Sequence, residues 1–159
     1  MNIHYQPIGR IRSPFQNIEG MPIQPTGAQG IQGRIEVKTE FTSALQDLEG
    51  FSYIILLYHL HQISKVEMIV TPFLDNQPHG TLSTRAPSRP NPIGHSVVKL
   101  ISREENIIHI ENVDILDDTP LLDIKPYVPK FDHHVVERMG WLEINQNKVQ
   151  KTSSDSRFK

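Results

Sequence analysis

The chain has 159 residues, and at roughly 150 residues per domain this length indicates one domain with room for a buried core. It contains no cysteine, which excludes a disulfide framework, a thiolate zinc site and a cysteine nucleophile. The net charge is −2, from 16 Lys and Arg against 18 Asp and Glu, which excludes a domain dominated by a polybasic nucleic-acid surface. Contact with RNA would therefore need a local patch.

Most of the chain consists of short strand-like segments that are rich in β-branched and aromatic residues. Turns with Gly, Pro, Asn or charged residues separate these segments. The predicted strands cover residues 8–12, 34–37, 51–60, 65–70, 96–102, 107–112 and 141–144. Residues 102–106 are typical of a hairpin tip between two of these strands.

Helix-like segments are few and short. One is predicted at residues 42–48, where Thr42 can cap a helix and Gly50 can end it. The other is predicted at residues 132–138 and closed by Gly140. Neither exceeds about two turns.

This pattern of many strands and few helices predicts a mainly β domain, an antiparallel β-barrel. A doubly wound fold would need alternating long helices, and neither G-x-G-x-x-G nor the P-loop pattern is present. We expect the barrel to span residues 1–144 and a polar, basic tail at 145–159 to be frayed.

The N-terminus has no basic segment followed by an apolar one, so no signal peptide is predicted. The apolar stretch 51–63 carries His59, His61 and Gln62 and is far shorter than the roughly 20 residues that span a bilayer. We expect a cytoplasmic protein with no membrane partner.

Charge is unevenly distributed along the second half of the chain. Residues 76–103 contain four basic and no acidic residues, whereas residues 104–124 contain seven acidic and no basic ones. Two such segments either attract one another across a sheet or frame a site for a ligand that carries both charges.

The most unusual segment is the loop 84–94, in which three Pro residues fall within six positions. Proline excludes a helix or a central strand here, so the loop is stiff. It holds the guanidinium groups of Arg85 and Arg89, which suit a carboxylate or a phosphate. The alternative is a rigid connector with two solvated arginines.

Residues 117–127 carry a second cluster of polar groups. Asp117, Asp118, Thr119 and Pro120 are typical of a turn, with carboxylates able to bond nearby backbone amides. If the segment that follows is a strand, residues 123 and 125 share a face. They form a weak surface pair, or the acids accept hydrogen bonds from ribose hydroxyls or an amine.

His59 and His61 share a strand face, as a metal-binding pair would, in a pattern weakly similar to the cupin motif. The second half of that motif fails, because His95 directly follows Gly94. We therefore predict no metal site, and a cupin-like metal enzyme stays a minor alternative.

Together these segments resemble the TsaA-like family of TrmO-type tRNA methyltransferases. The resemblance covers residues 3–131, and its motifs lie at residues 8–15, 48–53, 84–94, 117–120 and 123–127. It implies a β-barrel that forms a homodimer and binds S-adenosyl-L-methionine, a small-molecule methyl donor. The family's methyl acceptor is N6 of threonylcarbamoyladenosine beside the anticodon of tRNA.

The resemblance also implies the roles of individual residues. Cofactor contacts would fall on Ile23, Gln24, Pro25, His61, Gln62, Arg85, His95, Asp117, Asp118, Thr119 and Pro120. Substrate contacts would fall on Arg89, Asn91, Lys125 and Tyr127. Our catalytic hypothesis is that Asp123 or His61 removes the acceptor's proton, while Lys125 or Arg89 steadies its acidic arm.

Three departures from the family pattern bear on the substrate. Ile23 stands where an Arg is frequent, Asp118 stands where Gly is usual, and longer relatives carry a further C-terminal domain. Here the RNA would be held by residues 76–103, from both subunits of a dimer, and by the basic tail. The alternatives are a methyltransferase for a small molecule and an S-adenosylmethionine-binding sensor or regulator without methyl transfer.

Overall fold

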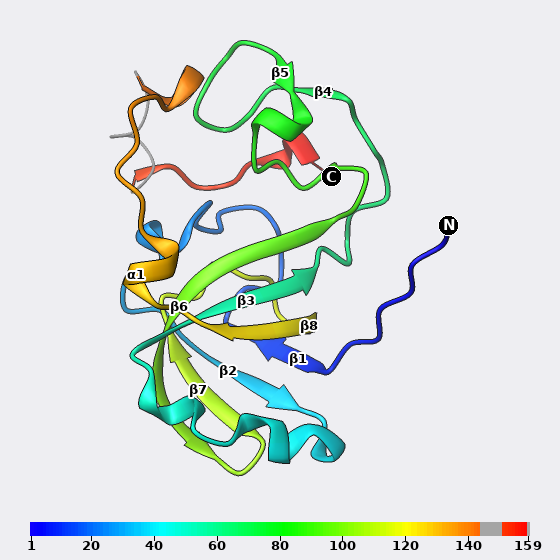
Figure 1. Cartoon of the computed structure of the whole chain (residues 1–159). Helices are drawn as coiled ribbons and strands as arrows, with labels where there is room; N and C mark the ends of the chain where they lie inside the picture. Colours follow the sequence, from blue (N-terminus) through cyan, green and yellow to red (C-terminus); the bar gives the residue numbers. More distant parts are fainter. Residues whose placement is uncertain (144–150, 159) are drawn as a thin grey trace.

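The computed structural model describes residues 1–143 and 151–158 (Figure 1). Six strands form a closed antiparallel barrel in the spatial order β1-β2-β7-β6-β3-β8, which confirms the predicted fold class. They are β1 (Gly9–Arg12), β2 (Gln32–Val37), β3 (Tyr53–His59), β6 (Ile93–Glu104), β7 (Ile107–Glu111) and β8 (Thr119–Pro126).

Aliphatic side chains that alternate along each strand fill the barrel. In β3, Ile54 and Leu56 are fully buried, whereas Ile55 and Leu57, at the alternate positions, face outward and are partly exposed. This period of two is expected of a sheet with one face on a core. The main buried aliphatic residues are Ile11, Ile35, Ile54, Leu56, Val98, Ile108, Ile110 and Leu121.

The predicted strands at 8–12, 34–37, 51–60, 96–102 and 107–112 are confirmed, with ends shifted by a few residues. The predicted hairpin is also confirmed, and its tip consists of Glu105 and Asn106 between β6 and β7. The predicted strand at 65–70 shrinks to β4 (Ile69–Val70), which pairs outside the barrel with β5 (His79–Gly80). β8 was not among the predicted strands, because its opening residues have the chemistry of a turn.

The helical predictions succeed only in part. The predicted helix at 42–48 is replaced by two 3-10 helices, Thr39–Leu45 and Leu48–Gly50, which are interrupted at Asp47 by a left-handed backbone with φ 67°. The helix predicted at 132–138 is wrong: α1 (Pro129–Asp132) ends at the first residue of that range. Residues 131–140 are all exposed, so no packing stabilises a longer helix there.

Three further short 3-10 helices lie in the loops: η1 (Pro25–Gly27), η4 (Thr81–Ser83) and η7 (Ser156–Phe158). The predicted strand at 141–144 is wrong, since Gly140–Leu142 form a 3-10 helix and residue 144 lies outside the described residues. Within the described part of the chain, no helix has the length and apolarity needed to cross a membrane.

The C-terminal segment 151–158 is packed rather than frayed, so that expectation is wrong for these residues. Ser154 N donates to Met21 O at 2.8 Å, and Phe158 is 5% exposed against Phe73. The remaining tail residues, 145–150 and 159, lie outside the described residues, as does the proposed domain boundary at 144.

One end of the barrel gathers the long loops, and we term it the loop end (Figure 1). It is formed by the C-terminal ends of β1, β3 and β7 and the N-terminal ends of β2, β6 and β8. The connections at this end are residues 13–31, 60–92 and 112–118. Most of the predicted site residues lie on these connections.

Candidate functional site

Two of the predicted cofactor residues are in direct contact across the loop end. Arg85 Nη1 donates a hydrogen bond to Gln24 Oε1 at 2.9 Å, although the residues lie 61 positions apart. Gln24 stands directly before η1, whose first residue is Pro25, and Ile23 is half-buried beside it. The exposed guanidinium of Arg85 is therefore held in place by the N-terminal loop.

His95 lies on the outer face of β6, near Arg85. Burial and the positive charge of Arg85 both lower the pKa of His95, while Asp132 of α1 opposes this shift. In the sheet, Leu57 of β3 pairs with His95 on one side and with Asp123 of β8 on the other. The three residues form a row across the outer face, about 10 Å from end to end.

Asp123 and Lys125 form an ion pair on this outer face, with Lys125 Nζ 2.6 Å from Asp123 Oδ2. The side chains are 44% and 58% exposed, so the pair contributes well under about 1 kcal/mol to stability. The surface pair foreseen from the sequence is thus confirmed, and the roles of these residues in catalysis stay predictions.

Residues 117–120, which form a turn and the start of β8, are bound to the N-terminal segment through two carboxylates. Asp117 Oδ1 accepts a hydrogen bond from Ser13 N at 3.0 Å, and Asp118 Oδ1 pairs with Arg10 at 3.0 Å and Arg12 at 2.9 Å. Asp118 has φ 60°, the left-handed region that favours glycine, at the position where the family usually has Gly. These contacts assign the two carboxylates a structural role, and ligand contacts by them stay predictions.

His61 lies beside the same turn. Its Nδ1 is 3.4 Å from Thr119 Oγ1, and the Thr119 hydroxyl donates to Leu116 O at 2.6 Å. Burial lowers the pKa of His61 below its ordinary value of about 6.5, although nearby Asp118 opposes the shift. At neutral pH the imidazole is therefore unprotonated and able to accept a proton.

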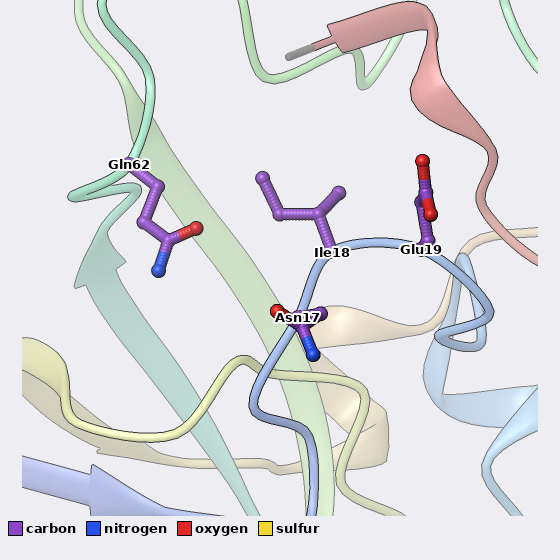
Figure 2. Close-up of a pocket in the computed structure, with 4 residues that line it drawn as sticks. All are labelled: Asn17, Ile18, Glu19 and Gln62. Carbon is purple, nitrogen blue, oxygen red and sulfur yellow. The ribbon is translucent and has the colours of Figure 1, made fainter.

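Gln62 lines an open hollow of about 500 Å³ together with Asn17, Ile18 and Glu19. Figure 2 shows the side chains of Gln62 and Ile18 reaching toward each other from two different loops. The volume lies within the roughly 300–1,000 Å³ of small-molecule sites. The residues from the N-terminal loop were not predicted, because no pattern in the sequence links them to Gln62.

Among the predicted substrate residues, Arg89 is engaged by its own loop. Its Nη1 donates to the backbone oxygens of Thr84 at 3.1 Å and Ala86 at 3.2 Å. Asn91 is exposed, and Tyr127 follows β8 and donates its backbone N–H to Tyr53 O at 3.1 Å. Substrate contact by these residues stays a prediction.

A buried chain of polar groups, missed in the sequence, lies beneath the loop end. Tyr58 Oη is 2.9 Å from Ser96 Oγ, and Ser96 Oγ donates to Asp114 Oδ1 at 2.7 Å. Burial raises the pKa of Asp114 to about 6, while Ser96 and Arg85 oppose the shift. Asp114 is one of seven acids in its segment, and the sequence does not distinguish it from the others.

Across residues 1–143 and 151–158, no group of three or more His, Asp or Glu side chains is placed to hold a metal ion. His59 is exposed, and electrostatic repulsion from it contributes to the lowered pKa of His61.

The chain was then compared with known proteins. The family model described as tRNA-methyltransferase O N-terminal domain matches residues 10–133. A probable S-adenosyl-L-methionine-binding protein of Pyrococcus abyssi is 52% identical over 98% of this chain and 85% of that protein. The human tRNA (adenine(37)-N6)-methyltransferase is 30% identical over 92% of this chain and 35% of that protein.

Among solved structures, the crystal structure of TrmO from Pseudomonas aeruginosa superimposes with a TM-score of 0.75 and 38% sequence identity. The match covers 89% of this chain and 63% of the Pseudomonas chain, so the present chain spans less than two thirds of that relative. The matched region includes all six barrel strands but for the first residue of β1. The chain therefore belongs to the tRNA-methyltransferase O N-terminal domain family.

Proposed function

We propose that the protein is an S-adenosylmethionine-dependent methyltransferase that methylates N6 of threonylcarbamoyladenosine next to the anticodon of tRNA. The observation that carries the proposal is the contact between Gln24 and Arg85 at the loop end, close to His95. These three residues come from separate segments and were all expected to bind the methyl donor. Membership of the family and the name of the human relative support methyl transfer to tRNA, and the name of the Pyrococcus relative supports binding of the donor.

The chemistry of the loop end fits such a donor. Arg85 presents a guanidinium with five N–H groups, of which one bonds Gln24, and the others suit the carboxylate of an amino acid. The hollow beside Gln62 has the volume of a small-molecule site. When bound, S-adenosylmethionine supplies an electrophilic methyl group on a sulfonium.

The acceptor nitrogen is weakly nucleophilic because it is conjugated to a carbonyl, and loss of its proton makes it attack more readily. His61 is unprotonated at neutral pH and can accept that proton at Nε2, while Nδ1 faces Thr119. Asp123 is the other candidate base. In that role it would have to exchange its contact with Lys125 for one with the acceptor.

A tRNA acceptor requires a local basic surface, because the net charge of the chain is −2. Arg85 is exposed in the basic segment 76–103 beside the proposed site, whereas Arg89 and Arg103 bond their own surroundings. We propose that the tRNA lies against this segment, and that the enzyme works in the cytoplasm where that substrate is found.

We also propose that the protein is a homodimer. Downstream of β8, an exposed segment carries Phe131, Val135, Val136 and Met139, with Val135 93% exposed and Phe131 74% exposed. Large apolar side chains gathered in one exposed segment are typical of an association surface. Light scattering should give twice the monomer mass, and Val135→Asp together with Phe131→Asp should give the monomer.

The activity is tested by incubating the pure protein with S-adenosylmethionine and tRNA from cells that lack this methyl group. Mass spectrometry of the digested tRNA should show threonylcarbamoyladenosine gaining one methyl group. Arg85→Ala should lose donor binding, whereas His61→Ala should lose turnover by about 100-fold even when the donor saturates the variant. Normal turnover in both His61→Ala and Asp123→Asn, with donor binding intact, would exclude both bases.

A second function is favoured by the name of the Pyrococcus relative, which states binding and no transfer. On this alternative the protein binds S-adenosylmethionine and acts as a sensor. Donor binding without methylation of any tRNA would support it. Binding to tRNA that weakens steeply with salt would argue for the methyltransferase.

A further inference from the structure

The polar chain Tyr58–Ser96–Asp114 has no part in the chemistry described above, yet it lies beneath the loop end. Ser96 is 1% exposed, Tyr58 is 7% exposed, and Asp114 at the end of the chain is partly buried. Removing a carboxylate from water is costly unless it is paired or hydrogen-bonded. Within the described residues, no ion pair involves Asp114.

The hydrogen bonds of this network have a fixed direction. Ser96 has a single hydroxyl hydrogen, which it donates to Asp114, so the Tyr58 hydroxyl must donate to Ser96. Both donors therefore point toward Asp114, which is the arrangement that an ionised carboxylate requires. Gly94 makes room for it, since a Cβ at this position would lie 2.1 Å from the Tyr58 ring.

Arg85 faces the same region from the loop above. Its positive charge lowers the pKa of both Asp114 and Tyr58, so the guanidinium lies within electrostatic reach of the network. Arg85 nevertheless donates to Gln24 and makes no ion pair with Asp114 among the described contacts. The Arg85 guanidinium and the Asp114 carboxylate thus lie near each other, and no ion pair joins them among the described contacts.

An α-amino acid group carries a carboxylate and an ammonium on one carbon atom, and its two charges match this arrangement. We propose that Asp114, held by Ser96 and Tyr58, binds the ammonium of the methyl donor while Arg85 binds its carboxylate. The proposal rests on the function proposed above and adds a second, oppositely charged contact to it. Asp114 would then determine specificity for donors with a free α-amine.

The test is calorimetric titration with two ligands, S-adenosylhomocysteine and its deaminated analogue, which lacks only the ammonium. Asp114→Asn keeps an oxygen for Ser96 and removes the charge. It should weaken binding of S-adenosylhomocysteine 10- to 100-fold and leave the deaminated analogue within about twofold of wild type. Arg85→Ala should weaken binding of both ligands.

Two controls separate this role from a structural one. Tyr58→Phe removes the hydroxyl farthest from Asp114 but leaves the Asp114 carboxylate in place. It should change binding of either ligand by less than about threefold. Thermal unfolding checks that every variant is folded. Equal losses for both ligands in Asp114→Asn, or no loss for either, would overturn the proposal.

Proton release gives an independent measurement. Near pH 6, binding of an ammonium next to Asp114 should displace its proton, so the heat should depend on the ionisation enthalpy of the buffer. His61 and His95, whose pKa values are lowered by burial, are present in Asp114→Asn as well, so the difference between the two proteins isolates Asp114. Absence of such a difference would overturn this inference and leave the proposed function standing. A wild type that binds neither S-adenosylmethionine nor S-adenosylhomocysteine would refute the proposed function itself.

Discussion

The barrel wall and the loop end are ordered by different interactions. The wall surrounds a cluster of 14 buried apolar residues, whereas the β4–β5 region of the loop end has a cluster of three, Val70, Ala86 and Phe158. Polar contacts such as Gln24–Arg85 and Asp118–Arg12 also hold the loop end, beside buried apolar residues such as Ala28. Single polar contacts contribute about 1 kcal/mol each, so the loops can vary while the barrel persists.

The largest expected effect lies in the wall. Leu56 is fully buried, and Leu56→Ala should lower the free energy of unfolding by about 3–4 kcal/mol because it leaves a cavity. Denaturant unfolding measures this loss. Leu82→Ala at the loop end, where the side chain is 77% exposed, is the control and should stay within about 0.5 kcal/mol. Similar losses for both variants would contradict the comparison.

Gly94→Ala tests the junction between the two regions. The new Cβ would lie 2.1 Å from the Tyr58 ring, which is itself buried and hydrogen-bonded to Ser96. We expect a loss of about 2–3 kcal/mol from overpacking. Gly50→Ala is the matched control, since nothing lies within 4 Å of its Cβ position. Equal unfolding midpoints for the two variants would show that the ring is not constrained.

Asp114→Asn should change stability in the opposite direction. The folded-state pKa of Asp114, about 6, lies above the unfolded value of about 3.9, so the native state binds more protons between these values and becomes less stable as pH rises. The variant should be about 2 kcal/mol more stable than wild type at pH 7, and this advantage should vanish near pH 4. Denaturant unfolding at both pH values measures it, and a difference that does not change with pH would refute it.

The smallest expected effect is that of Phe158→Ala. Its ring packs edge-on against Phe73 with centroids 5.1 Å apart, within the small cluster of the loop end. We expect a loss of about 1–2 kcal/mol, confined to the loops. Hydrogen exchange should accelerate in residues 68–88 and remain slow in β3 and β6. Acceleration throughout the barrel would show that the two regions unfold together.

The parts of the fold that were predicted correctly are those in which local pattern and tertiary packing agree. The alternation along residues 53–59 identifies β3 because every second side chain enters the core. β8 was missed because Asp117 to Pro120 have turn chemistry, while its strand geometry depends on pairing with β1 and β3. Residues 132–138 have local helix signals, but no partner surface stabilises them.

For the candidate site, the sequence indicated individual residues but few of the contacts between them. The contact between Gln24 and Arg85 joins residues 61 positions apart; the family resemblance assigned both to one site, but the contact itself was not predicted. The hydrogen bonds from Arg89 to backbone carbonyls could not be predicted from the sequence, because they depend on how the Pro-rich loop folds back on itself. Asp114 was missed because its hydrogen bond with Ser96, which distinguishes it from neighbouring acids, forms only in the folded chain.

Closure of the barrel has a consequence for how the molecule meets other proteins. Each of its six strands is hydrogen-bonded on both sides, so the barrel presents no free edge to which another chain could add a strand. The separate β4–β5 ribbon has two residues in each strand, too few to template such pairing. Any association must therefore be made by side chains, which protects the barrel against the intermolecular sheet growth that leads to amyloid.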